Sequence, residues 1–208
     1  MKDDIVPPHE SSGNSVASSV IDRAKQGDQE AFRQIVALYS GLVYCWCRSS
    51  GLSAEDTEDV GQQVFLAVSK GLHGFARTKP GDSFRAWLRV ITRSRIVDHV
   101  RVNAHREEAV GGSKNWHEPA VLPFPEDESD EERHAATSMI YEKAVSFVQG
   151  EFSEKDCRAF HLLIVEGLSS KEVAEQLGVK TNTVYIAKSR ILKRLRGIFG
   201  ELLDDEDA

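Results

Sequence analysis

Residues 167–184 read GLSSKEVAEQLGVKTNTV, and this stretch decides the fold expected for the C-terminal part of the chain. Val173 and Ala174 belong to an apolar stripe at helical spacing, and Val184 marks the buried side of a second helix. Ala174 lets two helices cross closely, while Gly178 can take the positive φ that a tight turn needs. The pattern predicts a helix-turn-helix. The alternative is an ordinary helical hairpin whose basic face is solvated.

The second helix of a helix-turn-helix lies in the major groove of DNA. Exposed residues near its start meet bases, and later basic residues meet phosphates. The candidates for these contacts are Lys180, Thr181, Asn182, Thr183, Tyr185, Lys188, Ser189, Arg190 and Arg194.

Apolar residues recur at three- and four-residue steps along most of the chain, and no segment shows the pattern of a strand. The expected helices cover about 28–48, 53–70, 84–105, 135–148, 154–165, 170–177 and 181–199. We therefore predict an all-α chain of two small helical domains joined by a flexible acidic linker. The predicted divisions are a disordered leader at 1–18, domains at 19–105 and 135–200, a linker at 106–134 and an acidic tail at 201–208.

The 208 residues include 26 Lys and Arg against 33 Asp and Glu, which gives a net charge of −7. Because DNA binding depends on local fields, the placement of these charges matters more than their sum. Basic residues gather within 85–106 and 180–196, and acidic residues within 126–132 and 201–207. The two basic stretches are candidate phosphate-facing surfaces.

Residues 84–101 read FRAWLRVITRSRIVDHVR, a helix with an apolar side and an arginine-rich side. Arginines hold phosphates while aromatic side chains and pockets receive unstacked bases, so this helix suits single-stranded or melting DNA. The predicted core stripe consists of Phe84, Trp87, Leu88, Ile91 and Val97. We accordingly interpret Trp87 as a core residue and not as a platform for a base.

Residues 55–68 read EDTEDVGQQVFLAV, an acidic and amide-rich helix that cannot favour DNA. Its charge fits a protein partner with a basic surface. Paired carboxylates can also serve acid–base catalysis, but neither a histidine partner nor a glycine-rich phosphate loop accompanies them here. We therefore do not expect an enzyme, and we expect no cofactor.

The three cysteines, Cys45, Cys47 and Cys157, are odd in number and closely spaced in part, which disfavours a disulfide framework. A zinc site would need more ligands than His161, so we expect buried free cysteines and no metal. No window has the roughly 18 apolar residues of a membrane span, and the chain opens on Lys2 and Asp3. We expect a cytoplasmic protein.

Three features follow each other along the chain: the acidic helix, the arginine-rich helix and, after a linker, the helix-turn-helix. Together they resemble the extracytoplasmic-function (ECF) sigma factors of bacterial RNA polymerase. The resemblance covers roughly residues 20–105 and 135–199. It implies a protein that binds core RNA polymerase, directs it to specific promoters and helps to melt the minus-ten region. The implied partners are the beta-prime and beta subunits of core RNA polymerase, promoter DNA and a separate anti-sigma protein.

The resemblance also implies a role for each helix. The acidic helix would dock on a coiled coil of beta-prime, and its docking residues would be Asp56, Asp59, Gln62, Gln63 and Phe65. The loop at about 72–83 and the arginine-rich helix would engage the minus-ten element through His73, Phe75, Arg77, Arg85, Arg89, Arg93, Ser94 and Arg101. The helix-turn-helix would read the minus-thirty-five element, and the acidic run at 126–132 could mimic nucleic acid in the polymerase channel.

The chain departs from the family pattern at two places. Ser94 stands where many relatives have asparagine, and residues 185–187 read YIA where many have a basic and hydroxyl triplet. The promoter sequence is therefore not transferable from the family.

Two other classes of protein remain open at this point. A helix-turn-helix transcriptional regulator shares the GLS and KEVA segments, although its receiver domain would need alternating strands and helices. A module that binds polymerase or an anti-sigma protein without reading DNA would not need the basic faces at 85–101 and 188–196.

Overall fold

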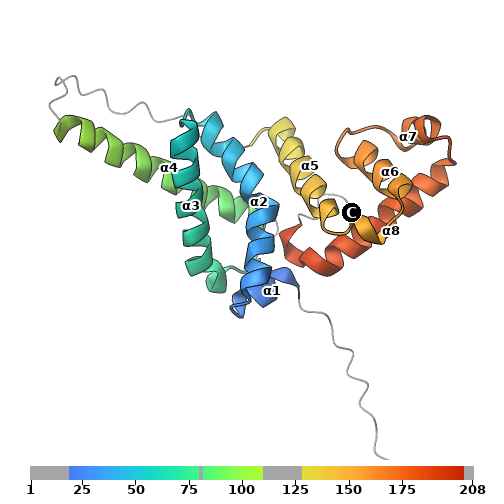
Figure 1. Ribbon diagram of the computed structural model, residues 1–208, viewed down its shortest axis with the longest axis horizontal. Coiled ribbons are helices and arrows are strands. Elements are labelled where there is room, and N and C mark those ends of the chain that lie inside the picture. The colour runs from blue at the N-terminus through green and yellow to red at the C-terminus, as the bar shows by residue number, and fades with distance from the viewer. Residues whose placement is uncertain (1–18, 80–81, 110–127, 204–208) are drawn as a thin grey trace, which may run out of the picture.

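The computed structural model describes residues 19–79, 82–109 and 128–203, and these residues form helices and no strand. Two groups of helices follow each other along the chain (Figure 1). The first group contains α1 (Val20–Lys25), α2 (Gln29–Ser49), α3 (Ala54–Gly71), the short η1 (Leu72–Gly74) and α4 (Phe84–Ala109). The second contains α5 (Asp130–Ser146), η2 (Gln149–Glu151), α6 (Glu154–Ile164), α7 (Ser170–Leu177), α8 (Thr181–Phe199) and η3 (Gly200–Leu202). The predicted all-α class is confirmed.

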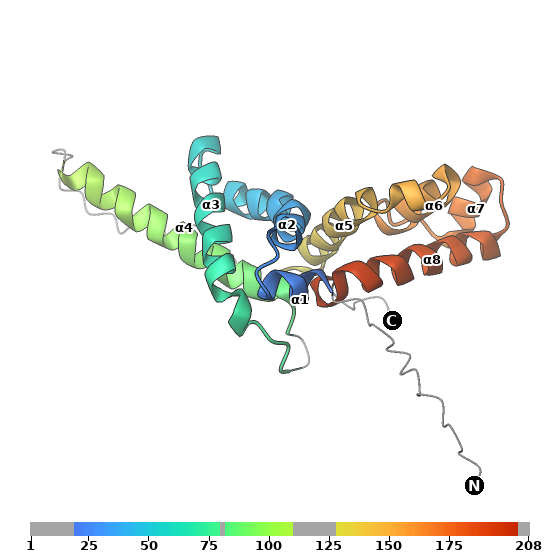
Figure 2. The ribbon, with the colours of Figure 1, turned by 60° about the horizontal axis from the view of Figure 1, so that its bottom comes forward.

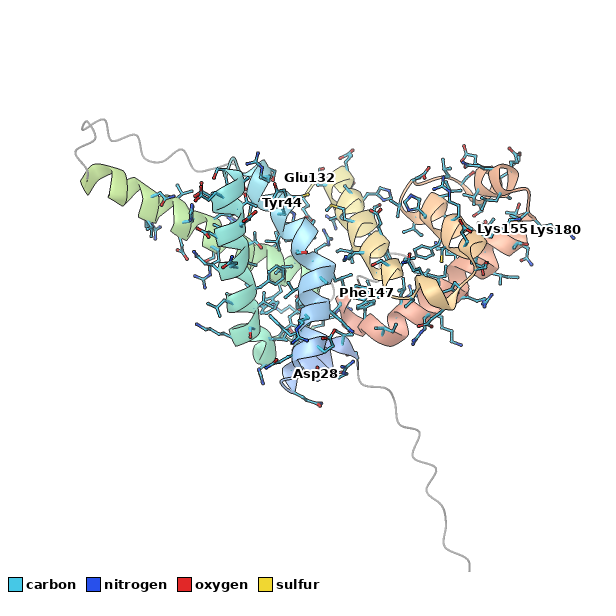
Figure 3. All side chains as sticks on the ribbon, in the orientation of Figure 1. Asp28, Tyr44, Glu132, Phe147, Lys155 and Lys180 are labelled. Atoms are coloured by element: carbon cyan, nitrogen blue, oxygen red, sulfur yellow. The ribbon has the colours of Figure 1, made fainter. Side chains whose placement is uncertain are left out.

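Side-chain caps fix where the helices of the first group begin. The Asp28 carboxylate accepts hydrogen bonds from the backbone N–H groups of Glu30 and Ala31, and the Ser53 hydroxyl accepts one from Asp56. Each cap satisfies donors that have no partner within the helix. In Figure 3, Asp28 lies beside α1 at the bottom of the view, while Lys180 lies at its right-hand end.

Four aromatic rings form the centre of the first group. Phe84 lies 5.0 Å from Tyr39 and 5.4 Å from both Phe75 and Trp87, measured between ring centroids. Phe75 and Trp87 are 5.1 Å apart. Such tilted and edge-on pairs add attraction beyond the burial of apolar area. Trp87 is thus a core residue, as the sequence predicts.

The buried stripe of α4 differs from the predicted one at a single position. Phe84, Leu88 and Ile96 are buried, whereas Val97 is exposed. Steps of four residues follow the face that α4 turns toward α2 and α3, and residue 97 falls about 100° away from that face. The prediction of Val97 as a core residue is therefore wrong, and Ile96 takes its place.

The helix-turn-helix prediction is confirmed by α7 and α8. The Ser169 hydroxyl accepts a hydrogen bond from the backbone N–H of Glu172, and the Glu172 carboxylate accepts one from the backbone N–H of Ser169. This reciprocal pair is a capping box at the start of α7. Gly178 ends α7 with φ of 62°, the left-handed conformation that favours glycine. Val173 and Ala174 pack with Val184 in a small core of their own.

The helices extend further into the predicted linker than the sequence analysis places them. α4 continues to Ala109, and α5 begins at Asp130 because Ser129 and Glu132 form a second capping box. The acidic residues of that first turn also face the positive end of the helix dipole. The predicted linker at 106–134 is therefore too wide at both ends, and its middle, 110–127, lies outside the described residues.

The two groups of helices share one apolar core. α5 packs beside α2, and the C-terminal end of α8 with η3 reaches α1 and α4 (Figure 2). The Tyr39 hydroxyl donates a hydrogen bond to the Leu202 carbonyl oxygen, and Leu202 and Leu203 are buried. The predicted tail at 201–208 therefore starts too early, because these leucines belong to the core. The predicted leader at 1–18 and residues 204–208 lie outside the described residues.

Candidate nucleic-acid and protein interfaces

The predicted base-contacting residues lie together on the outer face and the N-terminal turns of α8. Thr181, Asn182 and Thr183 are exposed, as are Tyr185, Ser189 and Arg190, while Lys188 is half-buried. Lys180 occupies the N-cap without a side-chain hydrogen bond to the helix. In Figure 3 it lies at the outer end of the second group, at the turn between α7 and α8. Polar side chains thus surround an accessible helix start.

Two arginines of α8 are engaged with the neighbouring helices. Arg194 donates from Nε and Nη2 to the two oxygens of Glu151, at 2.6 and 2.8 Å. This bidentate pair raises the pKa of the guanidinium and lowers that of the Glu151 carboxyl. Arg190 lies over the Phe152 ring and 3.8 Å from an Asp156 oxygen. The side chain of Arg194 is therefore held by the protein, which makes it a poorer candidate for phosphate contact than Lys188.

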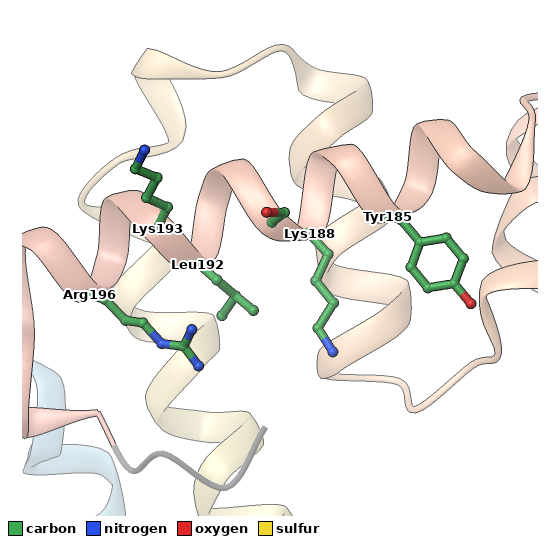
Figure 4. Close-up of a pocket in the computed structure, with 6 residues that line it drawn as sticks. Tyr185, Lys188, Leu192, Lys193 and Arg196 are labelled. Atoms are coloured by element: carbon green, nitrogen blue, oxygen red, sulfur yellow. The ribbon is translucent and has the colours of Figure 1, made fainter. Parts of the chain in front are cut away.

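A hollow runs along the exposed side of α8 (Figure 4). Its lining consists of Tyr185, Lys188, Ser189, Leu192, Lys193 and Arg196. Tyr185, Lys188 and Arg196 point to one side of the helix, and Lys193 points to the other. Two cationic side chains, Lys188 and Arg196, on the same side as a phenol make a surface suited to phosphate oxygens. The sequence analysis places Lys193 and Arg196 in the basic stretch but does not single them out, although their spacing along α8 is the signal that could have done so.

The predicted minus-ten residues are less uniformly exposed than those of α8. On α4, Ser94 and Arg101 are exposed and Arg93 is half-buried. In the loop before α4, His73 is exposed, and half-buried Arg77 donates from Nε to the Asp82 carbonyl oxygen at 2.9 Å. These residues remain candidates for contact with DNA.

Phe75 and Arg85 are buried in this conformation, which differs from the expectation that they face DNA. Phe75 belongs to the aromatic cluster, and its carbonyl oxygen accepts a hydrogen bond from Lys25 at 2.8 Å. An apolar ring gains more from that packing than from exposure to water. As the structure stands, neither side chain is offered to a base or a phosphate.

Arg85 is covered by the carboxylate of Glu128, which lies just before α5. Its guanidinium pairs with one oxygen of Glu128, and Arg89 donates to the other oxygen at 2.9 Å. The side chains of Arg85, Arg89 and Glu128 are 7%, 13% and 9% exposed. Glu128 is part of the acidic run that was expected to mimic nucleic acid. The sequence gives no signal for this contact, because about 40 residues separate the partners.

The predicted protein-docking residues lie along α3. Asp59, Gln62 and Gln63 are exposed, and Phe65 is half-buried against the core. Leu66 lies seven residues after Asp59, on the same side of the helix, and is 57% exposed. Leu66 is not among the predicted docking residues, although its spacing from Asp59 and Gln62 is the signal that identifies it.

Asp56 is tied to its own helix and to α4. The Ser53 hydroxyl lies 2.6 Å from one carboxylate oxygen, and His99 Nε2 lies 3.0 Å from the other. The hydrogen bond from Ser53, assisted by His99 against the effect of desolvation, lowers the pKa of the Asp56 carboxyl. Asp56 thus joins α3 to α4 and is less free to bind a partner than Asp59.

The described residues contain no group of three or more His, Cys, Asp or Glu side chains that could hold a metal ion. Cys47 is buried, and desolvation raises the pKa of its thiol to about 11. Cys45 is exposed, so the expectation of a buried cysteine is wrong at that position. Within the same residues, no helix combines the length and apolar character that crossing a membrane requires.

The geometry thus defines a class: an all-helical protein with a helix-turn-helix, a motif of DNA-binding domains, and a separate acidic face on α3. Two family models match the chain, Sigma-70 region 2 at residues 35–106 and Sigma-70 region 4 at residues 153–195. The chain belongs to the sigma-70 family, in its ECF group, and acts as a promoter-specific initiation factor for RNA polymerase. Members of this family are not, as a class, enzymes.

Two relatives illustrate the extent of the similarity. The RNA polymerase sigma factor CnrH of Cupriavidus metallidurans is 28% identical over 182 residues, which are 88% of this chain and 91% of that protein. The ECF RNA polymerase sigma factor ShbA of Streptomyces griseus is 25% identical over 189 residues, 88% and 95% of the two chains. A solved structure of CnrH in complex with the cytosolic domain of CnrY is 25% identical, covers 90% of this chain and 97% of that one, and has a TM-score of 0.35.

Proposed function

We propose that this sigma factor divides its work among three surfaces: α3 binds core RNA polymerase, α4 with the loop before it binds the minus-ten element, and α8 binds the minus-thirty-five element. The observation that carries this proposal is the accessible polar and basic face of α8 within a helix-turn-helix. An acidic face elsewhere in the same chain supplies the second kind of contact.

Core polymerase is proposed to bind α3 through Asp59, Gln62, Gln63 and Leu66. The Asp59 carboxylate steers a basic partner, the two amides add hydrogen bonds, and the exposed Leu66 supplies apolar area. By resemblance to the family, the partner is the coiled coil of beta-prime, with beta as a further contact. Asp56 and Phe65 would support this surface from its edge.

The minus-ten surface is proposed to consist of the accessible residues on α4 and in the preceding loop. They are His73, Arg77, Arg93, Ser94 and Arg101. Arg89 and Arg85 would join them once Glu128 moves away, because DNA phosphates and the Glu128 carboxylate compete for the same guanidinium groups.

The minus-thirty-five surface is proposed to be the first three turns of α8, with Asn182 and Ser189 toward bases and Lys188 toward phosphates. We further propose that the factor works in the cytoplasm and that a separate anti-sigma protein restrains it, as the resemblance to the family implies.

Run-off transcription tests this assignment. Core RNA polymerase freed of other sigma factors is combined with the full chain and with promoter fragments from the source genome. We expect specific transcripts that require the chain. Asp59→Lys should abolish both the transcripts and the binding to core polymerase, because it reverses a charge at the centre of the α3 surface.

The matched control is Glu142→Lys, which reverses an exposed charge on α5, away from the three surfaces. It should leave transcription intact. Binding to polymerase without any transcript would instead favour an interaction module, and binding to duplex DNA without polymerase would favour a helix-turn-helix regulator.

A further inference from the structure

The outward face of α8 carries an apolar side chain among polar ones. Positions 182, 186, 189 and 193 point away from the core, opposite Val184 and Ala187. Three of them hold Asn, Ser and Lys, as a DNA-facing helix requires. The fourth is Ile186, which is 49% exposed.

The Ile186 side chain has no role in the cores of the molecule. It belongs neither to the main core nor to the small core of the helix-turn-helix. Its neighbours Val184 and Ala187 pack in the small core, and residues further along α8 pack in the main one. A β-branched residue also has a lower helix propensity than alanine or lysine. Neither packing nor helix formation explains an isoleucine at this position.

The major groove offers one apolar group to a protein, the 5-methyl group of thymine. All other edge groups that distinguish the base pairs there are hydrogen-bond donors or acceptors. Isoleucine can make neither kind of hydrogen bond. An exposed isoleucine at the centre of a groove-facing helix therefore fits a thymine and no other base.

Tyr185, although next in the chain, faces a different part of the DNA. It is 56% exposed and points to the same side of α8 as Lys188 and Arg196 (Figure 4). Its phenol thus belongs with the cationic groups suited to phosphates, which contact every sequence alike. This leaves Ile186 as the apolar residue of α8 that faces the bases.

Resting on the proposed minus-thirty-five function, we propose that Ile186 is a specificity-determining residue that reads the methyl group of a thymine in that element. Asn182 lies four residues earlier on the same face, about 6 Å away along the helix. Asparagine pairs with adenine through both N6 and N7. Since bases repeat about every 3.4 Å, the thymine lies within about two base pairs of the base that Asn182 contacts.

The test replaces thymine by deoxyuridine, which lacks only the 5-methyl group. Holoenzyme made from the full chain and core polymerase first selects duplexes from a pool randomised across the upstream element. Each thymine of the selected duplex is then replaced in turn, and the affinity is measured at constant salt. At one position we expect about a fourfold loss, the equivalent of one buried methyl-sized group at about 0.8 kcal/mol.

Ile186→Ala should remove that difference: the variant should bind thymine and uracil duplexes equally, at the affinity of the unmodified protein for the uracil duplex. The matched control is Val102→Ala, which shortens another exposed apolar residue, on α4, and should keep the full thymine preference. Circular dichroism melting should show both variants folded, because each side chain is about half exposed.

Two results would overturn the inference while leaving the proposed function intact. One is a selected element at which no thymine can be distinguished from uracil, and the other is an Ile186→Ala variant that distinguishes them as the unmodified protein does. A pool that yields no enriched duplex would be a failure of the minus-thirty-five function itself, and the inference would fall with it.

Discussion

At the scale of single residues, Glu128 shows how one side chain changes the meaning of a predicted surface. The arginines of α4 are readable from the sequence as a basic face, and Arg93 and Arg101 remain partly or fully accessible. The burial of Arg85 and Arg89 depends on a carboxylate about 40 residues away, which no local pattern predicts. The sequence therefore identifies the arginine-rich helix but not which of its arginines are accessible to solvent.

Glu128→Gln tests this contact. The change removes the negative charge that neutralises two nearly buried guanidinium groups, so the free energy of unfolding should fall by about 2–3 kcal/mol. Urea unfolding followed by circular dichroism measures it. Glu142→Gln, on an exposed part of α5, should change the same quantity by less than about 0.5 kcal/mol. Equal effects of the two substitutions would show that the Glu128 contact contributes nothing particular.

At the scale of elements, helix positions are predictable wherever the signals are local. The caps at Asp28 and Ser53 and the turn at Gly178 act within four residues, and the helices they delimit are found where the sequence places them. α5 begins earlier than predicted, because the acidic residues around Ser129 and Glu132 suit a linker as well as the capping box that they form. Val97 is exposed because nine residues separate it from Leu88, which places it about 180° around the helix from that buried side chain.

Gly178→Ala tests the turn on which the helix-turn-helix depends. A β-carbon at this position would meet no atom within 4 Å, so only the left-handed backbone opposes the alanine. The free energy of unfolding should fall by about 1–2 kcal/mol. Gly61→Ala is the matched control within α3, where there is also open space and the backbone is helical. It should instead raise the free energy of unfolding by about 0.5–1 kcal/mol. The melting temperatures of the two variants should therefore move in opposite directions. A higher melting temperature for Gly178→Ala would contradict the assigned turn.

At the scale of the whole molecule, the two groups of helices are predictable as units, but their junction is not. It depends on contacts such as that between Tyr39 and Leu202, which are 163 residues apart. Phe84 touches Tyr39, so the start of α4 lies close to the end of α8. The 19 residues of α8 extend about 29 Å and residues 84–101 of α4 about 26 Å, so even end to end these two helices reach only about 55 Å.

This distance is too short for both promoter elements at once. Their centres are about 25 base pairs apart, which is about 85 Å along B-form DNA. We therefore expect the junction to open when both elements are bound. We accordingly predict that the arrangement with Leu202 and Leu203 buried belongs to the free factor and is lost in the complex on the promoter.

Leu202→Ala tests this consequence. Leu202 is fully buried at the junction, so the free energy of unfolding of the free chain should fall by about 2–4 kcal/mol, and its radius of gyration by small-angle X-ray scattering should rise. Run-off transcription at a temperature where the variant stays folded should nevertheless remain, because the contact is absent from the opened state. Leu162→Ala makes the same change inside the small core of the helix-turn-helix and should reduce transcription. If Leu202→Ala lost transcripts to the same degree, the junction would have to persist on the promoter.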